Sequence, residues 1–270
     1  MYSPQPDPWN SGDLYEPYVG RWSRLVAREF LAWLAPPPGG RWVDCGCGTG
    51  ALTDAVLAET APDGVVGVDI TAEYVAYARA HITDPRATFS VGDVQALDLD
   101  AAAFDMAVSG LVLNFVPRPE RMVTAMVRVV RPGGTVALYV WDYAGEMQLM
   151  RHFWDAAVAL DPTAAEKDEG RRFPICAPEA LARLFDEAGL RAVATRAIDV
   201  PTLFSTFDDY WTPFLSGQGP APGYAMSLTE ERRAALRERI RATLPIAADG
   251  SIPLRARAWA VRGTSAPRLG

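Results

Sequence analysis

Lysine is almost absent from this chain of 270 residues, in which Lys167 is the only one. A phosphate-binding loop of the form GxxxxGK[ST] needs a lysine directly after glycine, whereas Lys167 follows Glu166, so this loop is excluded. A Schiff-base enzyme would have to use Lys167, which lies in a polar stretch with nothing to desolvate it. The composition therefore argues against nucleotide hydrolysis through a phosphate loop and against lysine-based covalent catalysis.

Cysteine and histidine are also scarce. The chain has three cysteines, Cys45, Cys47 and Cys176, and two histidines, His81 and His152. Three cysteines do not make a disulfide framework, which favours a reduced, cytoplasmic setting. Two neighbouring cysteines and two distant histidines are too few ligands for a zinc site. We therefore expect no metal and interpret Cys45 and Cys47 as small loop residues.

A net positive charge and long apolar runs are missing as well. The formal net charge is −7, which argues against a nucleic-acid partner because phosphate contacts need a basic face. The longest strongly apolar run, 106–116, is interrupted by Ser109, Gly110 and Asn114 and is too short to span a bilayer. The first ten residues lack the basic start and apolar stretch of a signal peptide. We expect a soluble cytoplasmic protein without a membrane partner.

What the chain does contain is a regular alternation of short apolar runs and amphipathic stretches, the pattern of a parallel sheet covered on both faces. The predicted strands are 41–45, 65–69, 87–91, 104–109, 134–141, 191–200 and 256–262. The predicted helices are 14–34, 51–59, 72–81, 119–130 and 178–188. We predict a doubly wound α/β fold.

The organisation along the chain follows from this alternation. We expect a flexible tail over 1–13, an N-terminal helical lid over 14–40 and one α/β domain over 41–270. Two segments break the alternation, at about 142–176 and 201–253, and both are rich in aromatic and turn residues. Insertions of this kind usually lie over the carboxyl edge of such a sheet, so we interpret them as a partly helical cap.

The strongest local motif is VDCGCGTG at 43–50, directly between a predicted strand and a predicted helix. Its glycines permit a tight turn and let a ligand approach the backbone without a Cβ clash. Such a loop suits a nucleotide-containing cofactor, and with Ala51 it also satisfies the GxGxxG/A dinucleotide fingerprint. By itself the loop leaves S-adenosylmethionine and NAD open.

Three carboxylates narrow the choice of cofactor. Asp44 would repel a pyrophosphate and attract the ammonium of a methionine moiety, although it could also merely order the turn. Asp69 ends the second predicted strand, where a carboxylate accepts hydrogen bonds from ribose hydroxyls in either kind of site. Asp93 follows the third strand and could accept the adenine amino proton, the alternative being a helix N-cap.

At this point the sequence resembles a known family. The segments VDCGCGTG, VVGVDI, VGDVQALDLD, FDMAVSGLVLNFVP and VVRPGGTVALYVW follow, in order and spacing, the motifs of class I S-adenosylmethionine-dependent methyltransferases. The resemblance covers about 15–140 and is strongest to the small-molecule branch that includes ubiquinone and menaquinone biosynthetic enzymes. It implies a Rossmann-like, mostly parallel seven-stranded sheet with an antiparallel last strand.

The resemblance also implies roles for individual residues. Asp44, Gly46, Gly48 and Gly50 would hold the methionine end of S-adenosylmethionine. The ribose and adenine would contact Asp69, Ile70, Asp93 and Val94. The sulfonium and methyl would be lined by Ser109 and Leu111. The lid over the cofactor would contain Tyr15, Tyr18, Arg21 and Trp22, with Arg21 as a partner for the methionine carboxylate and plain packing as the alternative for the aromatic residues.

Catalytic groups are less evident. Relatives often carry histidine where this chain has Asn114, and an amide cannot accept a proton, so a general base at that position is in doubt. His152 and Tyr210, both in the insertions, are the other candidates. In-line displacement at a sulfonium depends mainly on alignment of the reactants, so no catalytic dyad is required.

The insertions are unusually aromatic. Their rings include Trp141, Tyr143, Phe153, Trp154, Phe204, Phe207, Tyr210, Trp211 and Phe214. We interpret them as a cover that excludes water and packs against an apolar or aromatic substrate, the alternative being a second small core that braces the fold. The sequence thus predicts methyl transfer from S-adenosylmethionine to a small molecule. The alternatives are an NAD-dependent oxidoreductase and a non-catalytic S-adenosylmethionine-binding protein of the same fold.

Overall fold

The computed structural model describes residues 20–217 and 219–266, which form two compact units. Of these residues, the unit that we call the sheet unit takes 23–141, 175–198 and 258–266. The second, which we call the insertion unit, takes 20–22, 142–174 and 199–257. In the described part of the chain, no helix is both long and apolar enough to cross a membrane.

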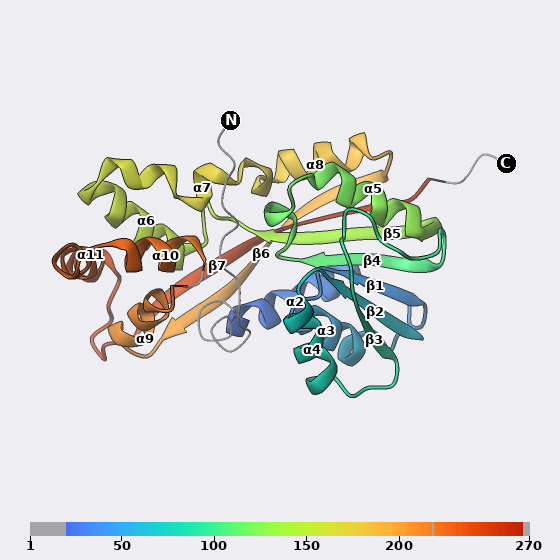
Figure 1. The fold of residues 1–270 in the computed structure, drawn as a ribbon, viewed down its shortest axis with the longest axis horizontal. Helices are drawn as coiled ribbons and strands as arrows, with labels where there is room; N and C mark the ends of the chain where they lie inside the picture. Colours follow the sequence, from blue (N-terminus) through green and yellow to red (C-terminus); the bar gives the residue numbers. More distant parts are fainter. Residues whose placement is uncertain (1–19, 218, 267–270) are drawn as a thin grey trace. The chain divides into compact units, whose positions relative to one another are not determined.

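A seven-stranded sheet is the framework of the fold (Figure 1). In chain order its strands are β1 (Arg41–Cys45), β2 (Gly64–Asp69), β3 (Ala87–Val91), β4 (Phe104–Gly110), β5 (Val130–Trp141), β6 (Arg191–Phe204) and β7 (Ile252–Thr264). Their order in the sheet is β3-β2-β1-β4-β5-β7-β6. The first five strands pair in parallel, whereas β7 pairs antiparallel to β5 with Tyr139 opposite Ala260. The expected sheet, including an antiparallel last strand, is confirmed.

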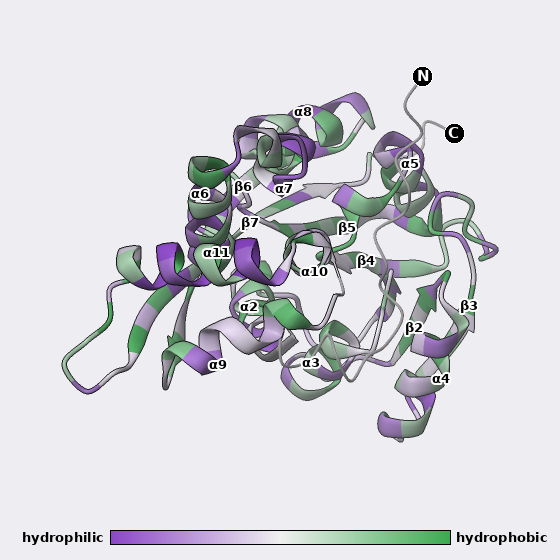
Figure 2. Ribbon diagram, turned by 60° about the vertical axis from the view of Figure 1, so that its left-hand side comes forward, coloured by the Kyte–Doolittle hydropathy of each residue, from purple (hydrophilic) through white to green (hydrophobic). Residues whose placement is uncertain are grey.

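The central strands form because nearly every side chain on them is apolar and buried. In β1 only Arg41 is exposed, and in β4 the run from Met106 to Val108 is buried on both faces. Hydrophobic residues colour most of β4 and the second half of β5 in Figure 2. Such continuous apolar strands need helices on both sides, as in parallel sheets generally.

Helices cover both faces of this sheet. On one side lie α2 (Arg21–Leu34), α3 (Ala51–Glu59) and α4 (Ala72–His81), and on the other α5 (Pro119–Val129) and α8 (Pro178–Glu187) (Figure 1). In α5 the buried residues Met122, Val123, Met126 and Val129 recur at helical spacing, which gives the helix one apolar face against β4 and β5. Of the helix expected over 14–34, residues 14–19 lie outside the described residues and the rest is confirmed as α2.

The strand order positions the candidate site. Chain connections run from β1 outward to β2 and β3, then return to β4 and β5 on the other side of β1. The order therefore reverses between β1 and β4. In a doubly wound sheet the crevice at such a reversal lies outside the carboxyl ends of the strands and takes the ligand. The glycine loop follows β1 at this point.

The insertion unit is mostly helical. Its helices are α6 (Gln148–Leu160), η3 (Pro162–Glu166), α7 (Glu169–Arg172), α9 (Phe207–Trp211), η5 (Thr212–Leu215), α10 (Pro220–Ser227) and α11 (Glu230–Thr243). The short helices η2 (Leu113–Phe115) and η4 (Pro174–Cys176) lie elsewhere in the chain. Helix α6 packs against η3, α10 and α11. Helix α11 buries Leu236 and Ile240 and is otherwise largely hydrophilic (Figure 2).

Aromatic side chains form the interior of the insertion unit. Phe153 stacks on Phe214 with ring centroids 4.6 Å apart, and Tyr210 contacts Phe204 at 5.3 Å and Phe214 at 5.5 Å. Phe153, Phe204, Tyr210 and Phe214 are fully buried. These rings bury one another, which favours the second of the two interpretations, a small core of its own.

Polar contacts tie α7 to α6 inside this unit. Arg151 forms an ion pair of 2.8 Å with Asp168, the N-cap of α7, and the indole N–H of Trp154 donates to Glu169. Burial raises the pKa of Glu169 to about 8, although its hydrogen bonds oppose the shift. The carboxyl group is therefore mostly protonated at neutral pH, because an ionised group there would lose its hydration.

Candidate functional site

The loop between β1 and α3 carries three glycines with left-handed backbone. Gly46, Gly48 and Gly50 have φ angles of +79°, +51° and +93°. The amide N–H groups of Gly46 and Cys47 both donate to the carbonyl oxygen of Val68 on β2, at 2.7 and 3.1 Å. Residues with a Cβ adopt these φ values only at an energetic cost, so glycine at the three positions favours this turn.

Asp44 is the most unusual group of the loop region. It is fully buried, and its Oδ2 accepts a 2.7 Å hydrogen bond from the Thr53 hydroxyl. Its Oδ1 is also buried and has no hydrogen-bond partner in the described part of the chain. Burial raises the pKa of the carboxyl to about 7, which the Thr53 bond partly offsets and the charge of Asp69 increases. A buried acceptor without a donor costs stability, so this oxygen suits a ligand that brings a donor or a positive charge.

Asp69 links the glycine loop to the end of β2. Its Oδ2 accepts from the Gly48 amide and its Oδ1 from the Thr71 amide, both at 2.9 Å. The sequence pattern predicted only a ribose contact and missed this structural role. A carboxylate has about four lone-pair sites, so two acceptor positions are left for ligand hydroxyls.

Ile70 and Asp93 follow neighbouring strands at the same edge of the sheet. Ile70 is 70% exposed, which leaves an apolar surface for a flat ring. The Asp93 carboxylate accepts from the Gln95 amide at 2.8 Å and the Gln95 side chain at 3.1 Å, while Val94 is buried. Asp93 therefore shapes the turn, and its second oxygen stays near the surface.

Ser109 and Leu111 lie at the end of β4. The Ser109 hydroxyl donates to the Cys45 carbonyl at 2.6 Å and so joins β4 to β1. Leu111 has a φ of +63°, uncommon for a residue with a Cβ, and its amide donates to Tyr139 at 2.8 Å. Strain of this kind is often found where a backbone lines a ligand site. Their contact with the sulfonium stays a prediction.

The lid residues are only partly described. Tyr15 and Tyr18 lie outside the described residues, and Arg21 begins α2 without a described side chain. Trp22 is buried and packs edge-on against Phe204 with centroids 5.6 Å apart. This contact agrees with the packing alternative for Trp22.

The three catalytic candidates have different surroundings. Neither polar atom of the buried Asn114 side chain has a hydrogen-bond partner among the described residues. Tyr210 is fully buried and donates its hydroxyl to the Leu149 carbonyl at 2.8 Å, and burial raises its pKa well above the ordinary value. His152 is half-buried, and burial lowers its pKa while Asp155 opposes the shift. Asn114 alone lies in the sheet unit with the glycine loop.

Two supporting residues escaped the sequence analysis. Thr53 bonds Asp44 from the first turn of α3, a contact that only the packing of α3 on β1 creates. A Cβ at Gly67 would lie 2.5 Å from the Phe89 ring and 3.0 Å from the Cys47 sulfur. The buried Cys47 thiol thus packs closely against β2, and burial raises its pKa, which agrees with a small structural residue rather than a reactive one.

Replacing Gly46 with alanine is expected to destabilise the loop. The new methyl group would lie 2.6 Å from both γ carbons of Val112 at a left-handed φ. The conformation costs about 1–2 kcal/mol and the overlap about 1–3 kcal/mol. Gly48→Ala is the control, because a Cβ there meets no atom within 4 Å in the described part of the chain. Denaturant unfolding should show the larger loss for Gly46→Ala, and equal losses would contradict this packing.

Comparison with known proteins gives the family. The family described as methyltransferase domain matches residues 43–138. A demethylmenaquinone methyltransferase of Roseiflexus castenholzii is 34% identical over 183 residues, which cover 62% of this chain and 75% of that protein. A 2-methyl-6-phytyl-1,4-hydroquinone methyltransferase of Synechocystis sp. is 28% identical, with 68% of this chain and 57% of that protein covered. The chain belongs to the class I S-adenosylmethionine-dependent methyltransferases.

Solved structures share the fold of this methyltransferase. Phosphoethanolamine N-methyltransferase 2 of Haemonchus contortus, in complex with S-adenosylhomocysteine, superimposes with a TM-score of 0.58 at 15% identity. The match covers 95% of this chain and 57% of that one. The matched family and relatives are methyltransferases, so they do not support the alternative of an NAD-dependent oxidoreductase or that of a non-catalytic binding protein.

Proposed function

We propose that this methyltransferase binds S-adenosylmethionine at the carboxyl ends of β1, β2 and β4 and methylates an apolar or aromatic small molecule by in-line displacement. The relatives named for demethylmenaquinone and for 2-methyl-6-phytyl-1,4-hydroquinone support this acceptor class. The observation that carries the proposal is the buried Asp44 Oδ1, which has no hydrogen-bond partner in the described part of the chain. An ammonium group would supply both the missing donor and the positive charge that an ionised Asp44 needs.

The residues around the loop fit the rest of the cofactor. The left-handed glycines leave the loop backbone open to the methionine moiety, and Gly48 has free space beside it. Asp69 has acceptor positions left for the ribose hydroxyls, and the exposed Ile70 and Asp93 offer a face and an edge to adenine. By family resemblance, Val94, Ser109, Leu111 and the lid residues Tyr15, Tyr18, Arg21 and Trp22 complete the site.

For methyl transfer by in-line displacement, the main role of the protein is to bind and orient the two reactants. When bound, S-adenosylmethionine supplies an electrophilic methyl group on a positively charged sulfur. Holding two reactants in line can contribute about 7–11 kcal/mol to lowering the barrier. Asn114 cannot remove a proton, but its side-chain amide can donate a hydrogen bond to the methyl-accepting substrate and accept one from it. The polar atoms of this amide have no other partner in the described part of the chain. We therefore favour acceptors whose nucleophilic atom is already ionised or carries a free lone pair.

The cofactor assignment predicts a ranked series of affinities. Calorimetry should detect S-adenosylhomocysteine binding and no NAD binding. Of the variants at Asp69, Asp93 and Asp98, Asp69→Ala should weaken binding most, since each lost charge-assisted hydrogen bond costs about 1.5–3 kcal/mol. Asp93→Ala should weaken it less, and the exposed Asp98 serves as the control, with Asp98→Ala binding normally.

Several outcomes would contradict the proposal. Tight NAD binding without S-adenosylhomocysteine binding would overturn the cofactor, and unchanged affinity in folded Asp69→Ala would overturn the ribose contact. Because Asp69 also holds Gly48, Asp69→Asn is measured in parallel, as it keeps an acceptor for that amide. Release of S-adenosylhomocysteine from labelled cofactor across a panel of phenols and hydroquinones then tests the acceptor class.

A further inference from the structure

The insertion unit contains a pocket of its own, lined by residues of 157–162 and 224–236. Its volume is about 350 Å³, at the small end of the range for ligand pockets. It is formed by the end of α6, the start of η3, the last turn of α10 and the first turns of α11. Leu160, Leu228 and Leu236 contribute to its apolar wall, together with Ala157, Pro162 and Ala235. Leu160 is 50% exposed, so this wall is open to a ligand from solvent.

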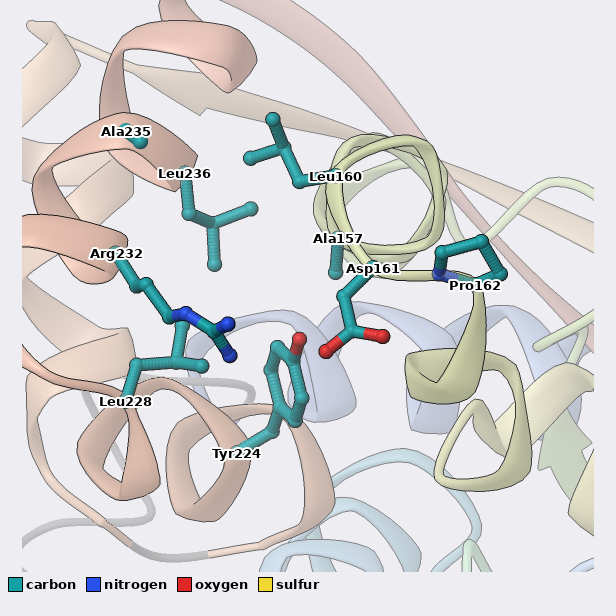
Figure 3. A pocket seen from close by; sticks show the side chains of 9 residues that line it. All are labelled: Ala157, Leu160, Asp161, Pro162, Tyr224, Leu228, Arg232, Ala235 and Leu236. Carbon is teal, nitrogen blue, oxygen red and sulfur yellow. The ribbon is translucent and has the colours of Figure 1, made fainter.

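Three polar side chains point into the same space from different elements. Figure 3 shows the Asp161 carboxylate, the Tyr224 hydroxyl and the Arg232 guanidinium converging between the apolar residues. They come from the C-cap of α6, from α10 and from the first turn of α11. A pocket with an apolar wall and a few convergent polar groups is the usual architecture of a small-molecule site.

These groups have hydrogen-bonding capacity left over. In the described part of the chain, the Arg232 guanidinium has no hydrogen bond or ion pair and the Tyr224 hydroxyl has no hydrogen bond. Asp161 uses Oδ1 for the amide and hydroxyl of Thr163, at 3.0 and 2.6 Å, which leaves Oδ2 available. Asp161 and Arg232 form no ion pair within 4.0 Å there, although they face one another (Figure 3).

The charges in the pocket balance at neutral pH. The Thr163 hydrogen bonds lower the pKa of Asp161, and the charge of Arg232 adds to this effect. Burial raises the pKa of Tyr224, with a further increase from Asp161. The pocket therefore presents one carboxylate, one guanidinium and one neutral phenol. A singly charged head group would be attracted to one of these charges and repelled by the other, whereas a neutral head group that both donates and accepts hydrogen bonds would be repelled by neither.

We propose that this pocket binds a neutral small molecule with an apolar body and a carboxamide-like head group, in which a carbonyl lies next to an N–H. The carbonyl oxygen accepts from the Arg232 guanidinium and the Tyr224 hydroxyl, and the N–H donates to Asp161 Oδ2. The apolar body packs against Leu160, Leu228 and Leu236. Binding here does not depend on methyl transfer, so the two proposals can fail separately.

Three probes with one apolar body and different head groups test the proposal: 4-phenylbutanamide, 4-phenylbutanoate and 4-phenylbutylamine. Titrations of the full chain at pH 7.5, followed by protein NMR or calorimetry, should show saturable binding with the amide at least tenfold tighter than either charged probe. If none of the three binds, or if a charged probe binds best, the proposal is wrong.

Variants of the two charged residues make the test specific. Asp161→Asn leaves an unbalanced guanidinium and should make the butanoate the tightest probe. Arg232→Gln leaves an unbalanced carboxylate and should make the butylamine the tightest. A merely structural role for these residues would weaken all probes alike, and unchanged selectivity in both variants would overturn the proposal.

Matched controls come from the same helix. Ala235 lines the pocket, so Ala235→Phe should fill it and abolish binding, whereas Ala234 does not line it and Ala234→Phe should bind normally. Arg239→Gln removes an exposed arginine of α11 that does not line the pocket and should keep the wild-type selectivity. Thermal unfolding of each variant shows whether it is folded. Equal binding by Ala235→Phe and Ala234→Phe would place the probes elsewhere.

Discussion

Asp44→Asn is expected to weaken S-adenosylhomocysteine binding at pH 7.5 by about 2–5 kcal/mol, or roughly 30- to 4000-fold. Asparagine keeps the size of the side chain and can still accept from Thr53, but it no longer offers a charge to an ammonium group. The loss is large because the carboxylate is fully buried, so water cannot replace the missing interaction.

The pH dependence of binding provides a second measure of the same contact. In the ligand-free protein, burial raises the pKa of Asp44 to about 7. Below that pH the group must lose a proton before it can pair with an ammonium, so affinity should fall as the pH drops from 7 to 5.5, with a slope that approaches tenfold per pH unit well below the pKa. The amide side chain of the Asp44→Asn variant has no such proton to lose, so the affinity of this variant should be flat over the same window.

The stability of the ligand-free protein should move in the opposite direction. The folded-state pKa of about 7 lies above the ordinary value of 3.8. The unfolded chain therefore gives up this proton at lower pH, and the group's contribution to stability is lost as pH rises from 3.8 to 7. Asp44→Asn should be at least as stable as the natural protein at pH 8, so its weak binding cannot be attributed to unfolding.

The control for this prediction is Asp54→Asn, which alters an exposed carboxylate in the first turn of α3. It should bind normally with an unchanged pH profile. If Asp44→Asn binds as tightly as Asp54→Asn at pH 7.5, then Asp44 only orders the turn and the ammonium assignment is wrong.

Tyr210→Ala is expected to lower the free energy of unfolding by about 3–5 kcal/mol, the range for large aromatic residues in a core. The ring is fully buried among Phe204, Phe207 and Phe214. Its hydroxyl also satisfies the Leu149 carbonyl. Tyr210→Phe should cost less, about 1–3 kcal/mol, because only the hydrogen bond is lost and the carbonyl stays buried.

An exposed residue of the same unit provides the comparison. Leu203 is 58% exposed on β6, and Leu203→Ala should change stability by no more than about 0.5 kcal/mol. Denaturant unfolding measures all three variants. If Tyr210→Ala instead keeps its stability and raises the Michaelis constant for an acceptor, the aromatic cluster contacts substrate and is not a structural core.

Some features of this protein could be predicted from the sequence because their causes are local. The strands β1, β2, β4 and β5 follow from largely apolar runs, and the turn after Cys45 follows from glycines, which adopt its left-handed φ angles most readily. The motif series placed the acidic residues Asp44, Asp69 and Asp93 at the ends of strands, as the sheet has them. The antiparallel direction of β7 was predicted only from the family resemblance, since the sequence of a single strand does not indicate its direction relative to its neighbours.

Other features were determined only by the tertiary structure, because they depend on contacts between residues that are distant in the chain. Gly48 and Asp69 meet because β1 and β2 are neighbours, and Thr53 reaches Asp44 because α3 folds back on β1. From the sequence we interpret the aromatic insertions as a cover, with a small core as the alternative, but ring content says nothing about what the rings face. Asp161 and Arg232 converge only through the packing of α6 on α11. Periodicity and turn chemistry specify elements, but the direction of a side chain in space follows from how those elements pack.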